Sequence, residues 1–161
     1  MKRKGLEVII DLKKKGDFVS RYNNNTLDSK LKEYIINELV GYSTESKVTI
    51  TINSAFELTE EEKEHYVKIL KKEFKEDLDE EKYLTKKNKI KEIYSAVVGT
   101  LFILASYFMN LDILGVLKEI ILIVGWVLIW EVAYSIIFTN GKRKISLRRL
   151  KQISNCKIEF K

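Results

Sequence analysis

Two long apolar segments in the second half of the chain most strongly limit what it can fold into. The first, IYSAVVGTLFILASYFM, covers residues 93–109, and the second, IILIVGWVLIWEVAYSIIF, covers residues 120–138. A helix of about 20 apolar residues crosses the hydrocarbon core of a bilayer. Both segments could instead be buried in a soluble protein, but the remaining chain is too short to cover them. We expect a transmembrane helical hairpin over 93–139, with residues 110–119 as its turn.

Charge flanking the two segments predicts how the hairpin is oriented. The formal net charge of +6 comes mostly from residues 141–161, which hold eight Lys and Arg against one Glu. Lysines also precede the first segment, whereas the turn has only Lys118. Positive flanks stay in the cytoplasm, so we expect a cell-membrane protein with two spans and both termini cytoplasmic.

Five of these basic residues follow the second segment closely. We expect them to contact anionic lipid headgroups at the cytoplasmic face, an explanation that needs no nucleic acid. They are Lys142, Arg143, Lys144, Arg148 and Arg149.

The first 78 residues have the patterns of a small α/β part. Apolar residues alternate over 6–12 and 47–53, which predicts two half-buried strands. Apolar residues at helical spacing predict a helix over 26–40, capped by Thr26 or Asn25 and ending at Gly41. Thr59-Glu60-Glu61-Glu62 is a capping-box pattern that predicts a second helix over 60–75.

The remaining segments connect this part to the hairpin. A charged linker helix is expected over 79–92, and a basic helix begins the segment 140–161. Alternation over 156–160 predicts a final strand, which must join the N-terminal sheet because a lone short strand is not stable. The predicted fold is an α+β membrane protein: a small cytoplasmic three-stranded sheet with helices, and an inserted two-helix transmembrane hairpin.

The carboxylate of Glu131 is the most unusual feature of the second segment. A central acid costs about 3 kcal/mol, and twelve Ile, Leu, Val and Phe residues outweigh it at about −0.3 to −0.6 kcal/mol each. Tyr134 and Ser135 share its helical face, and Thr100 is the hydroxyl at matching depth on the first segment. Glu131 could hold this hairpin together, contact another copy in a homo-oligomer, or line an ion pathway built from several copies.

Small residues on the first segment predict close helix packing. Ser95, Gly99 and Ser106 fall on one helical face. Small residues in such a stripe allow helices to approach each other in lipid.

A basic loop after the first strand is a candidate site for an anion. If the first two strands are parallel, the loop leaves the carboxyl end of the sheet, where ligands bind in open α/β sheets. The loop could hold a nucleotide, or it could be a solvated connection, because it lacks a phosphate-loop spacing. Its relevant residues are Lys13, Lys14, Lys15, Arg21 and Tyr22.

Other chemistry has little support in the sequence. His65 and Cys156 are the single histidine and the single cysteine, so one chain has too few such ligands for a zinc site. No nucleophile–base pair or glycine-rich phosphate cradle is visible. We expect no cofactor and no enzymatic activity, and an enzyme that uses the loop 13–21 is a remote alternative.

The span GWVLIWE, the basic helix after it and the terminal KIEF resemble small two-span membrane proteins of Ile- and Lys-rich bacteria. Some proteins of that build are similar to effectors of anti-phage defence. The resemblance implies a cytoplasmic domain that senses a ligand, nucleotide or protein signal, and spans that oligomerise and disturb the membrane. The alternative is a membrane-anchored scaffold or accessory subunit whose hairpin is only a tether.

Overall fold

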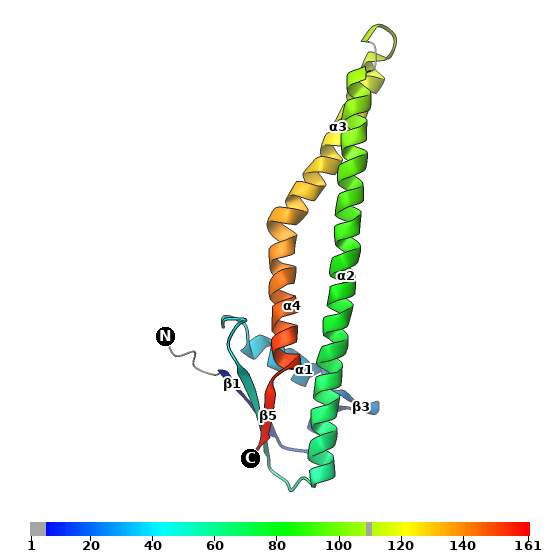
Figure 1. Ribbon diagram of the computed structural model, residues 1–161. Helices are drawn as coiled ribbons and strands as arrows, with labels where there is room; N and C mark the ends of the chain where they lie inside the picture. Colours follow the sequence, from blue (N-terminus) through cyan, green and yellow to red (C-terminus); the bar gives the residue numbers. More distant parts are fainter. Residues whose placement is uncertain (1–5, 109–110) are drawn as a thin grey trace. The chain divides into compact units, whose positions relative to one another are not determined.

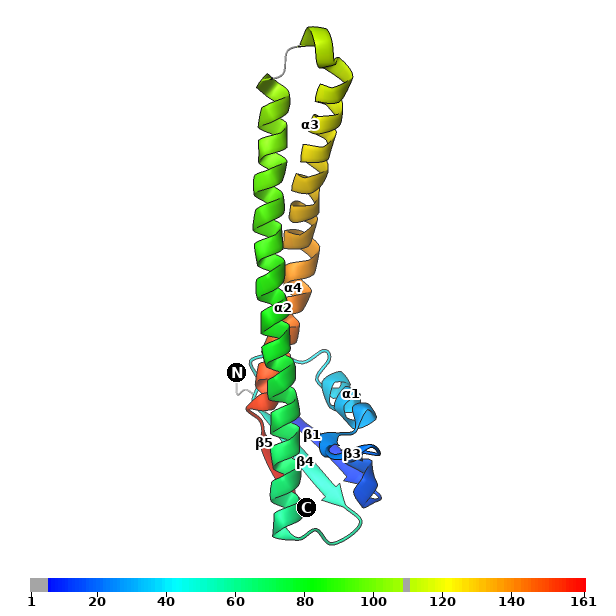
Figure 2. The same cartoon turned by 90° about the vertical axis from the view of Figure 1, so that its right-hand side faces the viewer.

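The computed structural model describes residues 6–108 and 111–161. The chain divides into two compact units. The α/β unit comprises Met1–Glu80 and Ile145–Lys161, and the hairpin unit comprises Glu81–Lys144. Figure 1 and Figure 2 show the elements of both units.

A three-stranded parallel sheet organises the α/β unit. Its strands are β1 (Leu6–Leu12), β4 (Val48–Ser54) and β5 (Lys157–Phe160), in the order β1-β4-β5. Leu6 pairs with Val48, and Ile50 pairs with Ile158. The three segments with apolar alternation are therefore strands of one sheet, and the last strand joins it beside the central one (Figure 2).

One face of this sheet carries the hydrophobic core. Val8, Ile10 and Leu12 of β1 and Ile50 and Ile52 of β4 are buried. The helices supply the other side of the core, with these buried residues: Ile35, Tyr66, Ile69, Leu70, Phe74, Leu150 and Ile153.

The opposite face of the sheet is polar. The Thr51 hydroxyl donates to Glu7 Oε1 at 2.6 Å, and the Asn53 side-chain amide donates to Asp11 Oδ1 at 2.8 Å. A half-buried sheet with one core face and one polar face explains the strict alternation of β1.

The segment between β1 and the first helix differs from the prediction. A short helical turn η1 (Lys15–Asp17) is followed by β2 (Val19–Ser20) and β3 (Asn23–Leu27), which pair antiparallel. Because β3 takes residues 23–27 into a ladder, helix α1 begins at Ser29 and ends at Glu38. Asp28, and neither Thr26 nor Asn25, is its N-cap, accepting from the Lys30 and Leu31 amides at 2.9 and 3.2 Å.

One continuous helix replaces three expected ones. Helix α2 runs from Glu60 to Phe108, so the expected helices over 60–75 and 79–92 and residues 93–108 of the first apolar segment are parts of the same helix. The sequence has no proline, and no other break interrupts the backbone ladder over this length. The helix opens with the predicted capping box, in which the Thr59 amide donates to Glu62 Oε2 at 3.0 Å and the Glu62 amide to Thr59 Oγ1 at 3.2 Å.

The second half of the hairpin is also longer than its apolar segment. Helix α3 covers Leu111–Tyr134, a π-helical turn η2 covers Ser135–Thr139, and α4 covers Asn140–Ser154. Residues 111–119 are thus helical where a turn was expected, and residues 109–110 lie outside the described chain. In η2 the Asn140 amide donates to the Ser135 carbonyl, five residues back. This turn therefore contains one residue more than an α-helical turn.

Candidate functional site in the helical hairpin

The two hairpin helices touch through glycine. A Cβ atom added at Gly99 would lie 3.0 Å from the Gly125 carbonyl oxygen and 3.0 Å from Leu128 Cβ. One added at Gly125 would lie 2.8 Å from Ile103 Cγ1 and 2.9 Å from the Gly99 carbonyl. A side-chain carbon at Gly125 would overlap its neighbours and one at Gly99 would be crowded, so the two helix backbones approach closely at this crossing.

The expected small-residue stripe lies in this interface. Ser95 and Ser106 are buried on either side of Gly99 along α2, at 8% and 2% exposure. The buried Ser106 hydroxyl donates a hydrogen bond to the Ile103 carbonyl of its own helix at 2.7 Å. Gly125 faces the stripe from α3; a lone glycine among large apolar residues of the second segment gives no stripe of its own that would predict this role.

Glu131 lies beside a lysine of the facing helix. Lys91 Nζ donates to Glu131 Oε1 at 3.0 Å, and both side chains are more than half exposed. One turn further along, the Ser135 hydroxyl donates to Glu92 Oε1 at 2.5 Å. These two contacts join α2 to α3 and η2 by a charge pair and a charge-assisted hydrogen bond.

A small pocket accompanies these contacts. Its volume is about 100 Å³, and both carboxylates, Lys91 and Arg143 lie on its wall. The other lining residues are Asn88, Ser95, Val132 and Ser135. Two acids and two bases balance each other, so the pocket suits water or a polar group more than an ion of one sign.

Thr100 and Tyr134 were expected to lie with Glu131, but both make other contacts. The Thr100 hydroxyl donates to the Ala96 carbonyl of its own helix at 2.8 Å. Tyr134 is exposed and packs its ring 4.9 Å from that of Phe138. The expected depth match was counted from the ends of the apolar segments, but the second segment runs past the first: Ser135 lies beside Glu92, so residues 136–138 continue beyond it.

Most of the apolar surface of the hairpin faces outward. Among 18-residue apolar windows of the two long helices, only 17% and 6% of residues are buried within the chain. The outward residues include large aliphatic and aromatic side chains, among them Val97, Leu101, Tyr107, Ile123, Trp126, Val127 and Trp130. Both helices are long and apolar enough to cross a membrane.

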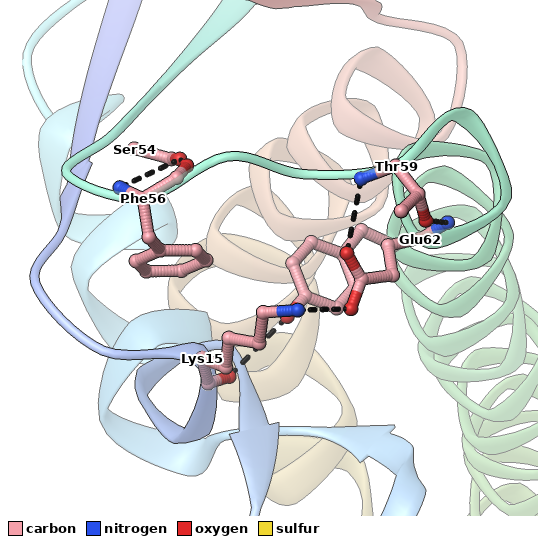
Figure 3. A network of polar contacts seen from close by, with 6 residues as sticks. Lys15, Ser54, Phe56, Thr59 and Glu62 are labelled. Atoms are coloured by element: carbon pink, nitrogen blue, oxygen red, sulfur yellow. Dashed lines mark hydrogen bonds and ion pairs between the residues drawn. The ribbon is translucent and has the colours of Figure 1, made fainter.

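In the α/β unit, the basic loop after β1 is partly committed to internal contacts. β1 and β4 are parallel, so this loop does leave the carboxyl end of the sheet. Lys15 Nζ, however, pairs with Glu62 Oε1 at 2.5 Å (Figure 3). The Tyr66 hydroxyl donates to the Lys15 carbonyl at 3.3 Å. The hydrogen bond from Lys15, followed by that from the Thr59 amide, lowers the pKa of Glu62.

The other members of this loop are not gathered into one site. Lys13 and Lys14 are exposed, and the Lys14 amide donates to Asp17 Oδ2 at 2.9 Å. Arg21 and Tyr22 lie at the turn between β2 and β3, where Tyr22 is 98% exposed. Of the three lysines in the loop, Lys15 is therefore the one with an acidic partner among the residues that the structure describes.

The expected basic cluster divides between the two units. Lys142, Arg143 and Lys144 belong to the hairpin unit, and Arg148 and Arg149 belong to the α/β unit. Arg143 lines the pocket beside Glu131. Arg149 has a buried Nε atom with no hydrogen-bond partner among the residues that the structure describes.

No group of three or more His, Cys, Asp or Glu side chains in residues 6–108 and 111–161 is arranged to hold a metal ion. The sequence did not single out Lys91 as the partner of Glu131, or Glu92 as the partner of Ser135. Both were visible only as flanking charge, and their roles depend on the register of two helices. Comparisons with protein-family models, curated proteins and solved structures return no match for this chain.

Proposed function

We propose that this chain is an integral membrane protein whose two-helix hairpin anchors the α/β unit at the cytoplasmic face of the cell membrane. The observation that carries the proposal is the outward apolar surface of α2 and α3, which the chain itself leaves uncovered. Burying each such side chain is worth about 1.5–3 kcal/mol. Lipid hydrocarbon would cover all of them at once.

The Lys91–Glu131 pair marks one edge of the proposed hydrocarbon layer. Lys91 precedes the apolar part of α2, residues 93–108, which rises by about 24 Å at 1.5 Å per residue and so covers most of a hydrocarbon core of about 30 Å. Glu131 then lies at the boundary with the headgroups, where a charge pair is tolerated. Residues 136–138 follow Ser135, which bonds to Glu92 just before the apolar part of α2, so in this proposal they lie in the interfacial layer.

The orientation follows from the same boundary. Lysines of α2 and the basic residues after η2 flank the same end of the hairpin. Positive flanks favour the cytoplasm, and they would contact anionic headgroups there.

The hairpin has the contacts of a self-contained anchor. The Gly99–Gly125 crossing uses the small residues within one chain, and Lys91 neutralises Glu131 within one chain. A tether therefore accounts for these features without a second copy. In this function the α/β unit binds the ligand or protein partner, and the chain carries out no catalysis.

A second candidate is an oligomeric effector that disturbs the membrane, as in anti-phage defence. It is favoured by the exposure of the Lys91–Glu131 pair, 67% and 54%, because each partner remains accessible to the opposite charge on a second copy. Exchanging partners between copies would bring several hairpins together.

Replacing the hairpin separates the two candidates. An unrelated two-span hairpin joined at residues 81 and 144 keeps the α/β unit at the membrane. An anchor retains its cellular phenotype and its partners after this exchange. An effector loses both toxicity on induction and depolarisation of the membrane, measured with a potential-sensitive dye.

Membrane insertion itself is tested by carbonate extraction and by labelling single cysteines in a Cys156→Ala background. The proposal expects the chain to stay with the membrane, and positions 86 and 142 to react from the cytoplasmic side. Release by carbonate would contradict it.

A further inference from the structure

A second groove lies in the α/β unit, at the end of the sheet opposite the basic loop. It is formed by the segment Thr44–Thr49 that leads into β4, by the second half of α4, and by the start of β5. Its volume is about 750 Å³. Because all three strands are parallel, this groove is at their amino ends.

Hydrogen bonds from α4 fix the loop that forms one wall of the groove. The Gln152 side-chain amide of α4 donates to the Ser46 carbonyl at 2.6 Å and to the Ser43 carbonyl at 3.4 Å. The Ser46 amide closes a turn onto the Ser43 carbonyl at 3.2 Å. Gln152 therefore fixes the loop 43–46 against α4. These two hydrogen bonds hold the two walls of the groove at a set separation.

Positive charge is concentrated on both sides of the groove. Lys47 contributes from the loop, and Arg148 and Lys151 contribute from α4. None of these three has a carboxylate partner among residues 6–108 and 111–161. Lys157 also lines the groove but pairs with Glu159 at 2.7 Å.

Hydroxyl donors complete the lining. Within the described chain, the side-chain hydroxyls of Thr44, Ser46 and Thr49 make no hydrogen bond, and all three residues line the groove. The single acid on the wall, Glu45, is exposed and has another contact of its own. Three free cations and three free hydroxyls face one acid.

We propose that this groove binds a phosphate-bearing anion. A guanidinium and two ammonium groups match the charge of a phosphoryl group better than that of a single carboxylate. The hydroxyls can donate to its remaining oxygens. The inference rests on the proposed function only in giving the α/β unit the ligand. It makes Arg148 a ligand-binding residue, whereas the sequence alone predicts that it contacts lipid headgroups.

The phosphoryl group could belong to a soluble compound or to a lipid headgroup. The two sources share the same chemistry at the groove. They differ in whether the ligand reaches it from solution or from the bilayer in which the protein is embedded.

The experiment uses the full chain in non-ionic detergent, titrated with inorganic pyrophosphate by calorimetry. The test variant is Arg148→Gln with Lys151→Gln. The matched control, Lys142→Gln with Lys144→Gln, removes the same charge from exposed positions of the hairpin unit. Each lost charge-assisted contact weakens binding by about tenfold or more, so we expect a large loss in the test variant and at most about a twofold loss in the control.

A second variant controls for loss of binding caused by misfolding of the first. Lys47→Gln changes the loop side of the groove and leaves α4 intact, and it should weaken pyrophosphate binding by about tenfold. Equal affinity in test and control variants, or no saturable binding to the unchanged chain, would overturn the proposal. Neither result depends on whether the hairpin inserts in a membrane.

Lipid nanodiscs then identify the source. The chain is placed in phosphatidylcholine discs with or without a phosphoinositide, and pyrophosphate is titrated again. Weaker apparent pyrophosphate binding in the phosphoinositide discs than in the phosphatidylcholine discs assigns the headgroup as ligand, because the headgroup then competes with pyrophosphate for the groove. Unchanged binding assigns a soluble phosphate compound.

Discussion

At Glu131 a carboxylate in an apolar segment has a partner in the same chain. Its Oε1 lies 3.0 Å from Nζ of Lys91, which precedes the apolar stretch of α2. An acid and a lysine at one level cost less to place near lipid than either alone, because each neutralises the other. The unusual residue in the second segment and the last lysine before the first segment are thus one feature.

Exchanging the two charges tests this pair. Lys91→Ala and Glu131→Ala should each lower the free energy of unfolding in detergent by a few tenths to about 1 kcal/mol. The swap Lys91→Glu with Glu131→Lys should recover most of the loss, measured by thermal melting. Thr100→Val is the control and should change little, because its hydroxyl bonds to its own helix. A swap less stable than both single variants would contradict the pair.

Burial raises the pKa of the Cys156 thiol to about 11, from an ordinary 9.0. The folded state therefore holds the proton more tightly than the unfolded state. Its contribution to stability is complete below pH 9 and is lost as pH rises to 11, by on the order of 2 kcal/mol. Cys156→Ala should lack this loss when unfolding is compared across that range. Rapid alkylation of the native thiol by iodoacetamide at pH 8 would show that it is not buried.

At the scale of elements, the Gly99–Gly125 crossing sets the register of the hairpin. Gly125→Ala should lower stability by about 1–3 kcal/mol, because its Cβ would meet Ile103 and the Gly99 backbone at under 3 Å. Gly115→Ala is the matched control. It has open space around its Cβ and should gain up to about 1 kcal/mol from helix propensity. Melting in detergent compares the two, and equal effects would mean that the crossing does not limit packing.

Elements with a local signal could be predicted, and those set by distant contacts could not. Alternation in β1, β4 and β5 is a property of each segment, and the Thr59–Glu62 box lies within four residues. The hairpin β2–β3 has little apolar alternation, since Asn23, Asn24 and Asn25 fill three of the five positions of β3. The partners of Glu131 and Ser135 depend on helix register, which Gly125 sets from 26 residues away from Gly99.

For the whole molecule, the order β1-β4-β5 gives the hairpin an unusual place in the topology. The connection from the central strand to its parallel neighbour contains α2, α3, η2 and α4. A parallel pair always needs a crossover, and here the crossover includes both apolar helices. The sheet is therefore complete only after the chain has passed through the hairpin and returned. Folding of the α/β unit must follow synthesis of both proposed spans.

The last strand should consequently be required for a stable α/β unit. Ile158→Asp with Phe160→Asp places charges against the core that β5 helps to cover, and we expect trypsin to digest the α/β unit of the full chain rapidly. Lys157→Ala with Glu159→Ala alters the polar face of the same strand and should leave its resistance nearly unchanged, because the pairing of Ile50 with Ile158 is kept. Equal resistance of the two variants to trypsin would mean that β1 and β4 form a stable sheet without β5. Such a two-stranded parallel sheet would have to bury Ile50 and Ile52 without their neighbour, and β4 would become an open edge.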